Sequence, residues 1–209
     1  LHLSIRRQRQ MCIRDRIGSF SVQNRQSITY DEMPQNLRDA VVSAENRTFW
    51  SDPGISVKGM SRAAFSVLRG GDVQGGSTIT QQYIKVLYLS QERTMQRKLK
   101  ELVLADKMGR KVPKEDILAG YLNTIYFGRG AYGVQAAARA YFNIDAKDLD
   151  LRQAAVLAAV LNNPTLFDPS DGPAARERLL GRYRYVLDGM LEMGRISQND
   201  HDAASHALP

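Results

Sequence analysis

The sequence has a single cysteine and no long hydrophobic run. Cys12 stands alone among 209 residues, so the chain cannot contain an internal disulfide, and one thiolate cannot hold a metal by itself. The longest apolar run covers 154–161, well short of the about 20 residues that a membrane-spanning helix needs. Internal repeats and low-complexity linkers are also missing, which excludes a solenoid architecture.

What the sequence does contain is an ordinary globular composition with an uneven distribution of charge. Hydrophobic residues make up 43% of the chain, the formal net charge is +7, and the isoelectric point is near 9.6. Length and composition are those of one domain with a sizeable core. Positive charge is concentrated in residues 1–29 and 85–114, while the remaining chain is net negative. Such patches suit an anionic partner, either a phosphate-bearing ligand, a nucleic acid or an anionic membrane.

Hydrophobic spacing predicts a chain made almost entirely of helices. The first runs from Pro34 and is expected to end near Phe49 and Trp50, because the turn signal Asp52-Pro53-Gly54 follows. Residues 17–30 are extended and polar, consistent with a strand. Further helices are predicted over 60–68, 77–89, 92–108, 114–123, 134–142, 151–161, 174–193 and after 197.

Two segments carry residues suited to catalysis or to ligand binding. Glu45 falls late on the first helix, beside aromatic residues, where burial could hold a general base; a surface ion pair with Arg47 or Arg38 is the alternative. GGSTITQQ opens another helix with Ser77 and Thr78, a site for an anion or simply a well-capped helix end. The spacing of a Walker loop is absent.

A ladder of basic residues follows this helix start and ends in one carboxylate, Glu101. It suits a ligand of phosphate type, although a solvated helical face and a routine ion pair between Arg97 and Glu101 would explain it equally well. Its members are Lys85, Arg93, Arg97, Lys98 and Lys100.

Taken in order, these segments resemble the peptidoglycan glycosyltransferase domain of bacterial class A penicillin-binding proteins and their monofunctional relatives. The resemblance extends from about Tyr30 to Pro169. It rests on five motifs, AENRTFWSDPG, GGSTITQQ, RKLKE, ILAGYLNTIYFGRGAYGVQAAARAYF and AAVLAAVLNNPTLFDP.

The resemblance implies a mainly α, two-lobed, lysozyme-like glycosyltransferase domain with a short extended N-terminal segment. On this basis residues 1–16 are expected to be a non-native or disordered basic leader, 17–32 the extended segment and 33–172 the catalytic domain. Residues 173–209 are expected to form helices leading towards a transpeptidase domain that the sequence lacks. A transmembrane anchor is likewise expected to lie outside this sequence.

The implied reaction is the polymerisation of lipid II into β-1,4-linked glycan strands by inverting displacement of undecaprenyl diphosphate. Glu45 matches the general base, and Glu101 matches a second essential glutamate that orients a basic side chain or a divalent cation. A diphosphate is a stable anion that needs charge stabilisation more than an acid. Basic residues implied to bind it are Lys85, Arg93, Lys98 and Lys100. Residues implied to line the cleft are Ser77, Thr78, Gln81, Gln82 and Asn123.

The resemblance also implies partners and a location. No organic cofactor is expected, with Mg²⁺ or Mn²⁺ near Glu101 as the one candidate metal. Expected partners are lipid II, the growing lipid-linked strand, the membrane surface and the cell-division or elongation machinery, but not nucleic acid. The expected location is the extracytoplasmic face of the bacterial cytoplasmic membrane. Residues 60–68 match an apolar jaw that dips into the bilayer, or else form an ordinary core helix.

Three positions depart from the family pattern. Asn46 stands where an aspartate is usual, Asp52 where a histidine is usual, and Gly109 where a glutamate is common. Altered hydrogen bonding, without loss of chemistry, is expected at the first two. The rival readings are a lysozyme-like muramidase or lytic transglycosylase, a catalytically inactive lipid II-binding module, and a basic nucleic-acid binder.

Overall fold

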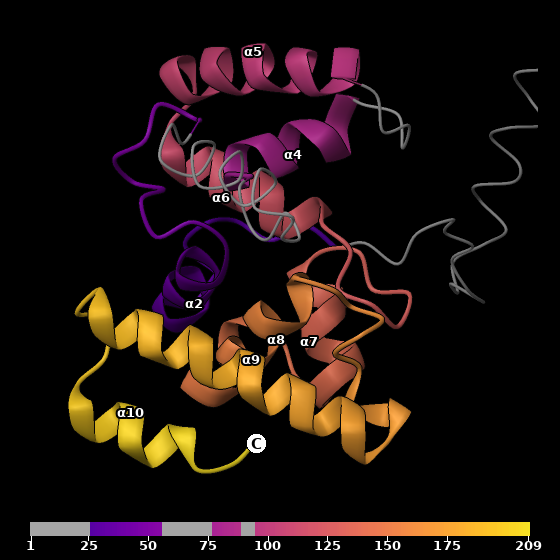
Figure 1. Cartoon of the computed structure of the whole chain (residues 1–209), viewed down its shortest axis with the longest axis vertical. Coiled ribbons are helices and arrows are strands. Elements are labelled where there is room, and N and C mark those ends of the chain that lie inside the picture. The colour runs from indigo at the N-terminus through magenta and orange to yellow at the C-terminus, as the bar shows by residue number, and fades with distance from the viewer. Residues whose placement is uncertain (1–25, 56–76, 89–94) are drawn as a thin grey trace, which may run out of the picture.

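The computed structural model describes residues 26–55, 77–88 and 95–209. Within these ranges the chain is helical, and its one β pairing is an isolated antiparallel bridge between Tyr126 and Tyr132. Figure 1 shows two groups of helices, with α4, α5 and α6 in the first and α2, α7, α8, α9 and α10 in the second. The mainly α, two-lobed architecture expected from the sequence is confirmed.

The second group is built around α8 (Leu151–Leu161). Residues 154–161 of this helix are all buried, as expected for a run of alanine, valine and leucine without a polar face. Asp150 begins the helix by accepting a hydrogen bond from the Gln153 backbone, and the Gln153 side chain bonds back in a capping box. Helices α2 (Gln35–Glu45) and α9 (Pro173–Glu192) pack on α8 and on each other.

The remaining parts of this group extend it at both sides. Helix α7 (Val134–Phe142) ends at Asn143 in the left-handed conformation, and α10 (Gln198–Ser205) packs on α9. Two short 3₁₀ turns, η1 (Ala146–Asp148) and η2 (Pro169–Asp171), complete it.

Among the described residues, three helices form the first group. Helix α4 (Ile79–Tyr88) packs on both α5 (Met95–Lys111) and α6 (Lys114–Thr124). Glycine lets α4 and α6 approach closely, because a β-carbon on Gly120 would lie 2.2 Å from the Tyr83 hydroxyl oxygen. Val112 and Pro113 separate α5 from α6, as the sequence predicted.

The predicted end of the first helix near Phe49 and Trp50 is wrong, because α2 ends at Glu45. Asn46 leaves the helical conformation with φ of −161°, and its side chain donates to Asp52. The backbone then turns, with the Phe49 amide bonded to the Asn46 carbonyl at 3.0 Å. Phe49 is nevertheless buried, so its hydrophobicity reflects the core and not a longer helix.

The predicted N-terminal strand over 17–30 is described only from residue 26 onward, and the described part is not a strand. Residues 26–29 have no regular structure, and a side chain takes the place of a partner strand. Asn123 accepts from the Ile28 amide at 3.0 Å and donates to the Ile28 carbonyl at 2.8 Å. In the described part of this segment, a side chain holds the backbone and no sheet forms.

Several predictions fall outside the described residues. They concern the leader 1–16, the helix over 60–68, the glycine pair at 75–76, and Arg93. In the described parts of the chain, no helix combines the length and the apolar character needed to cross a bilayer.

Candidate active site

Glu45 occupies the last position of α2, where the two groups of helices meet. Its side chain is 9% exposed, and its Oε2 accepts a hydrogen bond of 2.7 Å from Gln82 Nε2 on α4. The Gln82 amide is itself held by Tyr121 of α6, whose hydroxyl donates to Gln82 Oε1 at 2.9 Å. Tyr121 is fully buried. A chain of two hydrogen bonds thus runs from the core of the first group to the carboxylate.

The other carboxylate oxygen of Glu45 faces α9. Oε1 is buried, and no hydrogen bond to it exists among the described residues. The nearest cation is Arg182, with a guanidinium nitrogen 3.7 Å away, which is beyond hydrogen-bonding distance. Glu45 therefore has one oxygen occupied by a donor and one oxygen free to accept.

Burial sets the protonation behaviour of this carboxyl. Desolvation raises the pKa of Glu45 above its ordinary value, while the Gln82 hydrogen bond and the charge of Arg182 pull the pKa downward and only partly compensate. Burial, with a smaller contribution from Glu45, also raises the pKa of Tyr121 far above that of a free phenol. Tyr121 is consequently a neutral hydrogen-bond donor at any physiological pH.

Glu101 on α5 is buried and engaged by two cations. Arg97 donates to Glu101 Oε2 at 2.9 Å, and Lys98 donates to Oε1. Lys98 also donates to the Ser77 hydroxyl at 3.1 Å. Both oxygens of Glu101 thus orient basic side chains, and Lys98 links α5 to the start of α4.

Thr78 and Gln81 cap the start of α4. The Thr78 amide donates to Gln81 Oε1 at 3.1 Å, and the Gln81 amide donates to Thr78 Oγ1 at 3.2 Å. Thr78 Oγ1 also donates to the Gly54 carbonyl at 2.6 Å. Both side chains are buried, with 2% and 1% exposure, and Gln81 Nε2 has no hydrogen-bond partner among the described residues. A direct role in binding substrate stays a prediction.

The other predicted site residues divide into exposed and structural positions. Lys85 and Lys100 are exposed, and neither has an ion pair in the part of the chain that the structure describes. The side-chain amide of Asn123 is hydrogen-bonded to the backbone of Ile28 through both its oxygen and its nitrogen. The sequence reading missed Tyr121 and Arg182. Tyr121 lies inside a recognised motif, but nothing in the sequence distinguishes Arg182 from the other arginines of α9.

Two of the positions that depart from the family pattern are bonded to each other. Asn46 Nδ2 donates to Asp52 Oδ2 at 2.7 Å. Lys114 of α6 donates to the Asp52 carbonyl at 2.7 Å and to its carboxylate at 3.2 Å, and it lies over the Phe49 ring. This network fixes the chain immediately after Glu45 to the first group of helices.

Gly109 marks a close contact of two backbones. A β-carbon there would lie 2.3 Å from the Pro53 carbonyl oxygen and 2.7 Å from the Gly54 Cα. Gly54 has φ of +100°, and its own β-carbon would lie 2.2 Å from the Ala105 carbonyl oxygen. The turn after Glu45 therefore rests directly on α5. A glutamate at position 109 would not fit this arrangement.

The residues around Glu101 do not fit a divalent cation by themselves. Mg²⁺ and Mn²⁺ prefer several oxygen ligands, whereas Glu101 is one carboxylate between two basic side chains. Across the described ranges, no group of three or more histidine, cysteine, aspartate or glutamate side chains could hold a metal ion. The expected Mg²⁺ or Mn²⁺ near Glu101 stays a prediction.

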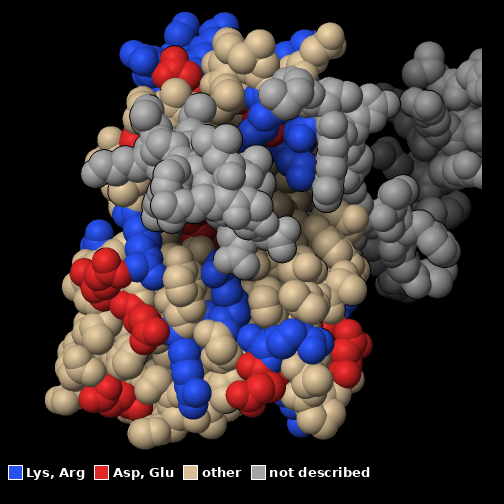
Figure 2. Space-filling view, in the orientation of Figure 1, with Lys and Arg blue, Asp and Glu red and all other residues tan. Residues whose placement is uncertain are grey.

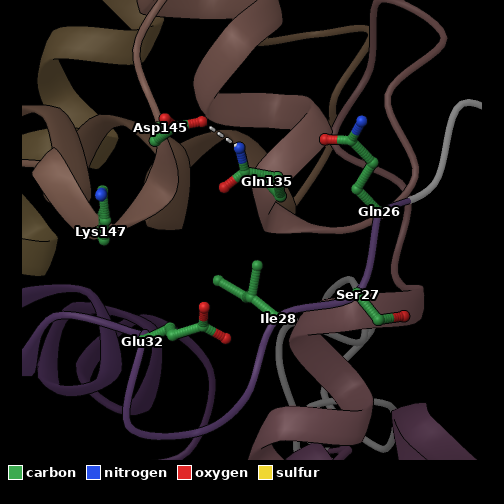
Figure 3. A pocket seen from close by; sticks show the side chains of 7 residues that line it. All are labelled: Gln26, Ser27, Ile28, Glu32, Gln135, Asp145 and Lys147. Carbon is green, nitrogen blue, oxygen red and sulfur yellow. Dashed lines mark hydrogen bonds between the residues drawn. The ribbon is translucent and has the colours of Figure 1, made fainter.

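A pocket of about 370 Å³ lies apart from these residues (Figure 3). Gln135 donates to Asp145 at 2.5 Å on one wall, and Ile28 and Glu32 form the opposite wall. None of the predicted site residues lines it.

Comparison with known proteins identifies the family. The model of the family described as Transglycosylase matches residues 14–191. The chain belongs to the transglycosylase family. It is a glycosyltransferase domain of the class A penicillin-binding protein type, as the resemblance of the five motifs implied.

Individual relatives agree with this assignment. Penicillin-binding protein 1A of Mycolicibacterium smegmatis is 46% identical over 185 residues, which cover 86% of this chain and 23% of the relative. Penicillin-binding protein 1A of Aquifex aeolicus is 44% identical over 188 residues, which cover 90% of this chain and 26% of the relative. The chain thus spans about a quarter of the length of these transglycosylase relatives.

A solved structure supports the fold. The crystal structure of penicillin-binding protein 1A from Haemophilus influenzae aligns with a TM-score of 0.52 at 23% identity, covering 91% of this chain and 18% of that one. The likeness concerns the fold alone and confirms the expected lysozyme-like fold class.

Proposed function

We propose that this transglycosylase domain polymerises lipid II into β-1,4-linked glycan, with Glu45 as the general base. The observation that carries the proposal is the environment of Glu45, a buried carboxylate. One of its oxygens is bonded to Gln82, and the other has no hydrogen bond from any residue that the structure describes. In the proposed step, Glu45 takes the proton of the acceptor 4-hydroxyl. The hydroxyl oxygen forms a bond to the anomeric carbon of the lipid-linked strand as the bond to the diphosphate breaks.

The raised pKa of Glu45 suits this role. A general base works best when its pKa is close to the operating pH, because it must be ionised yet able to hold the proton. Burial moves the pKa of Glu45 in this direction. The free Oε1 is the atom to which the proton would go, since Oε2 already accepts from Gln82.

The leaving diphosphate would be stabilised by basic side chains of α4 and α5. Lys98 is oriented by Glu101, and Lys85 and Lys100 are exposed. Arg93 is the fourth residue proposed to bind the diphosphate. In hydrolysis of a glycoside, a second carboxyl must donate a proton to a sugar oxygen. Glu101 is bonded to two cations, so its proposed role is to position Lys98 and Arg97. This difference favours glycosyl transfer over a muramidase reaction.

The membrane surface is the proposed location of the reaction. Side chains of α4 and α5 expose apolar surface, with Tyr88 at 65%, Leu99 at 64% and Val103 at 62%. Figure 2 shows Lys and Arg side chains at the end of the molecule where α5 lies. Apolar side chains among cations suit an anionic bilayer. The proposal places the domain on the extracytoplasmic face, beside the division or elongation machinery.

The test is polymerisation of labelled lipid II by the chain in detergent, read as a ladder of glycan lengths. Glu45→Gln should reduce turnover by at least about a hundredfold, as expected for loss of a general base, while lipid II is still bound. Glu177→Gln, an exposed glutamate on α9, is the matched control and should leave turnover unchanged. Unchanged turnover in Glu45→Gln would refute the base assignment. Release of muropeptides from finished peptidoglycan, without polymer, would favour the muramidase.

A further inference from the structure

Arg182 reaches the Glu45 carboxylate from a helix that the five sequence motifs do not include. Its guanidinium donates to the Ala44 carbonyl at 2.9 Å and lies 3.7 Å from Glu45 Oε1. The side chain is 19% exposed. The contact therefore joins the middle of α9 to the last turn of α2.

The position of this guanidinium is fixed by its neighbours. Arg182 lies 4.5 Å from the centre of the Tyr185 ring, and Arg47 lies 4.9 Å from the same ring while it pairs with Glu192. A cation over an aromatic ring is attracted to it, which restricts the directions that the side chain can take.

The two helices that carry this contact are held close together. A β-carbon on Gly189 would lie 2.3 Å from the Ser43 hydroxyl oxygen, and Ser43 donates to the Val186 carbonyl at 2.7 Å. Both contacts lie within a few residues of Arg182 or Glu45. The distance between the guanidinium and the carboxylate is therefore set by helix packing.

The two sides of the carboxylate differ in what they provide. Gln82 donates to Oε2 and occupies it, whereas Arg182 acts on Oε1 through charge at a distance too long for a hydrogen bond. Oε1 thus stays available to accept a proton, and the charge of Arg182 favours the ionised form of Glu45. A purely structural tie to Ala44 would not require a charge next to Oε1.

We propose that Arg182 is a positioning residue that, together with Gln82, fixes the Glu45 carboxylate so that Oε1 receives the acceptor proton. This inference rests on the proposed role of Glu45 as the base. Arg182 does not touch the sugars; it acts through Glu45.

The charges around Glu45 give this role a measurable consequence. Among the described residues, the groups that act on it are Arg182 from α9, Tyr121 from α6 and the neutral amide of Gln82 from α4. Burial raises the pKa of Glu45, and Arg182 opposes the rise. Without Arg182, Glu45 would stay protonated to a higher pH, and a protonated carboxyl cannot act as a base.

The experiment compares Arg182→Gln and Arg182→Lys with Arg184→Gln, an exposed arginine of the same helix that bonds the Ser205 carbonyl. Polymerisation rates are measured from pH 5.5 to 9. Arg182→Gln should lose about tenfold in kcat at pH 6 and recover towards high pH, with little change in KM. Arg182→Lys keeps the charge and should keep the wild-type pH profile at a kcat lowered a few-fold. Arg184→Gln should match the wild type.

A second readout does not depend on activity. The titration of the Glu45 carboxyl carbon is followed by NMR in chain labelled at glutamate, with Glu45→Gln to assign the signal. Arg182→Gln should move this titration to higher pH, and Arg182→Lys should not. Wild-type titration in folded Arg182→Gln, or an equal displacement in both variants, would overturn the inference. Should Glu45→Gln remain active, the base assignment fails while the titration still reports on Arg182.

Discussion

At the scale of single residues, the site depends on how each carboxyl is surrounded. Glu45 is held on one side by a neutral hydrogen-bond chain and on the other by a charge. Glu101 is paired with two cations. The two glutamates therefore have different surroundings. Those of Glu45 suit a group that takes a proton, and those of Glu101 suit a group that orients basic side chains.

Replacing Glu45 should stabilise the fold at neutral pH. The pKa of Glu45 is raised in the folded state. Its contribution to the free energy of unfolding is therefore fully present below the unfolded-state pKa and is lost as pH rises through the folded-state pKa, so at neutral pH the buried charge is a burden that Gln removes. Glu45→Gln should therefore raise Tm by about 2–4 °C at pH 7.5, the effect of roughly 1 kcal/mol in a chain of this size, and by less at pH 4. Thermal unfolding at both pH values measures this. An equal Tm difference at both would contradict it.

Removing the Tyr121 hydroxyl should disturb Gln82 and, through it, Glu45. Tyr121→Phe deletes the 2.9 Å bond to Gln82 and should cost about 1 kcal/mol of stability, because the amide loses a partner. We also expect a several-fold drop in kcat. Urea unfolding and polymerisation assays give the two numbers. Tyr88→Phe, exposed on α4, is the control, and an equal effect there would count against the hydrogen-bond chain.

At the scale of elements, contacts between helices and turns bring the site together. The turn after Glu45 rests on α5 through Gly54 and Gly109, and Lys114 ties the same turn to α6. Helix α9 brings Arg182 to the end of α2. Each contact joins segments that are distant in the sequence.

Adding one methyl group at Gly109 should force α5 away from the turn. Gly109→Ala places a β-carbon 2.3 Å from the Pro53 carbonyl oxygen, and we expect a loss of about 1–3 kcal/mol, typical of overpacking. Gly181→Ala on α9 is the matched control, since nothing lies within 4 Å of its added β-carbon. That variant should be neutral or slightly stabilising, because alanine favours helix. Chemical denaturation distinguishes them, and equal stabilities would be contrary to the described contact.

The attachment of α10 to α9 should weaken as pH rises. His201 lies 2.8 Å from Asp188 and 3.0 Å from Asp202, and hydrogen bonds to Asp202 and then Asp188 raise its pKa. The contribution of His201 to the free energy of unfolding is fully present below the unfolded-state pKa of histidine and is lost as pH rises through the raised folded-state pKa. Between pH 6 and 9, Tm of the wild type should therefore fall towards that of His201→Asn. A Tm difference independent of pH would argue against this attachment.

At the scale of the whole molecule, the two groups of helices have different surfaces. The first group exposes apolar side chains beside lysines at its far end, and the second group is built on the buried α8. Glu45 lies where the groups meet. A chain bound to a bilayer through α4 and α5 would keep this junction near the membrane.

Charged substitutions on α5 should weaken membrane binding. Leu99→Glu with Val103→Glu removes apolar surface that is 64% and 62% exposed and adds negative charge. We expect at least about a tenfold loss of partition into vesicles containing phosphatidylglycerol, equivalent to 1.4 kcal/mol. Leu166→Glu, on an exposed apolar residue of the second group, should have little effect. Vesicle sedimentation measures both, and undiminished binding of the double variant would remove α5 from the membrane face.

The sequence by itself determined the helical class, the position of most helices and the family, and it singled out the two glutamates as candidates. These follow from local signals: apolar spacing, capping residues, prolines and motifs of fixed order. One error was local, since the first helix ends at Glu45, where Asn46 bonds Asp52. The other was not, because residues 26–29 lack strand structure and Ile28 is bonded to Asn123, 95 positions away.

Only the tertiary structure decided which side chains surround Glu45. Gln82 of α4 and Arg182 of α9 lie against Glu45, and Tyr121 of α6 holds Gln82. Arg182 is 137 positions away from Glu45 in the sequence. At the start of α4, by contrast, the Thr78 hydroxyl and the Gln81 side-chain carbonyl cap the helix, as one of the two interpretations of GGSTITQQ expected. The reason is physical: a helix start is set by neighbouring residues, whereas burial and charge at a carboxylate depend on the packing of helices that the sequence places far apart.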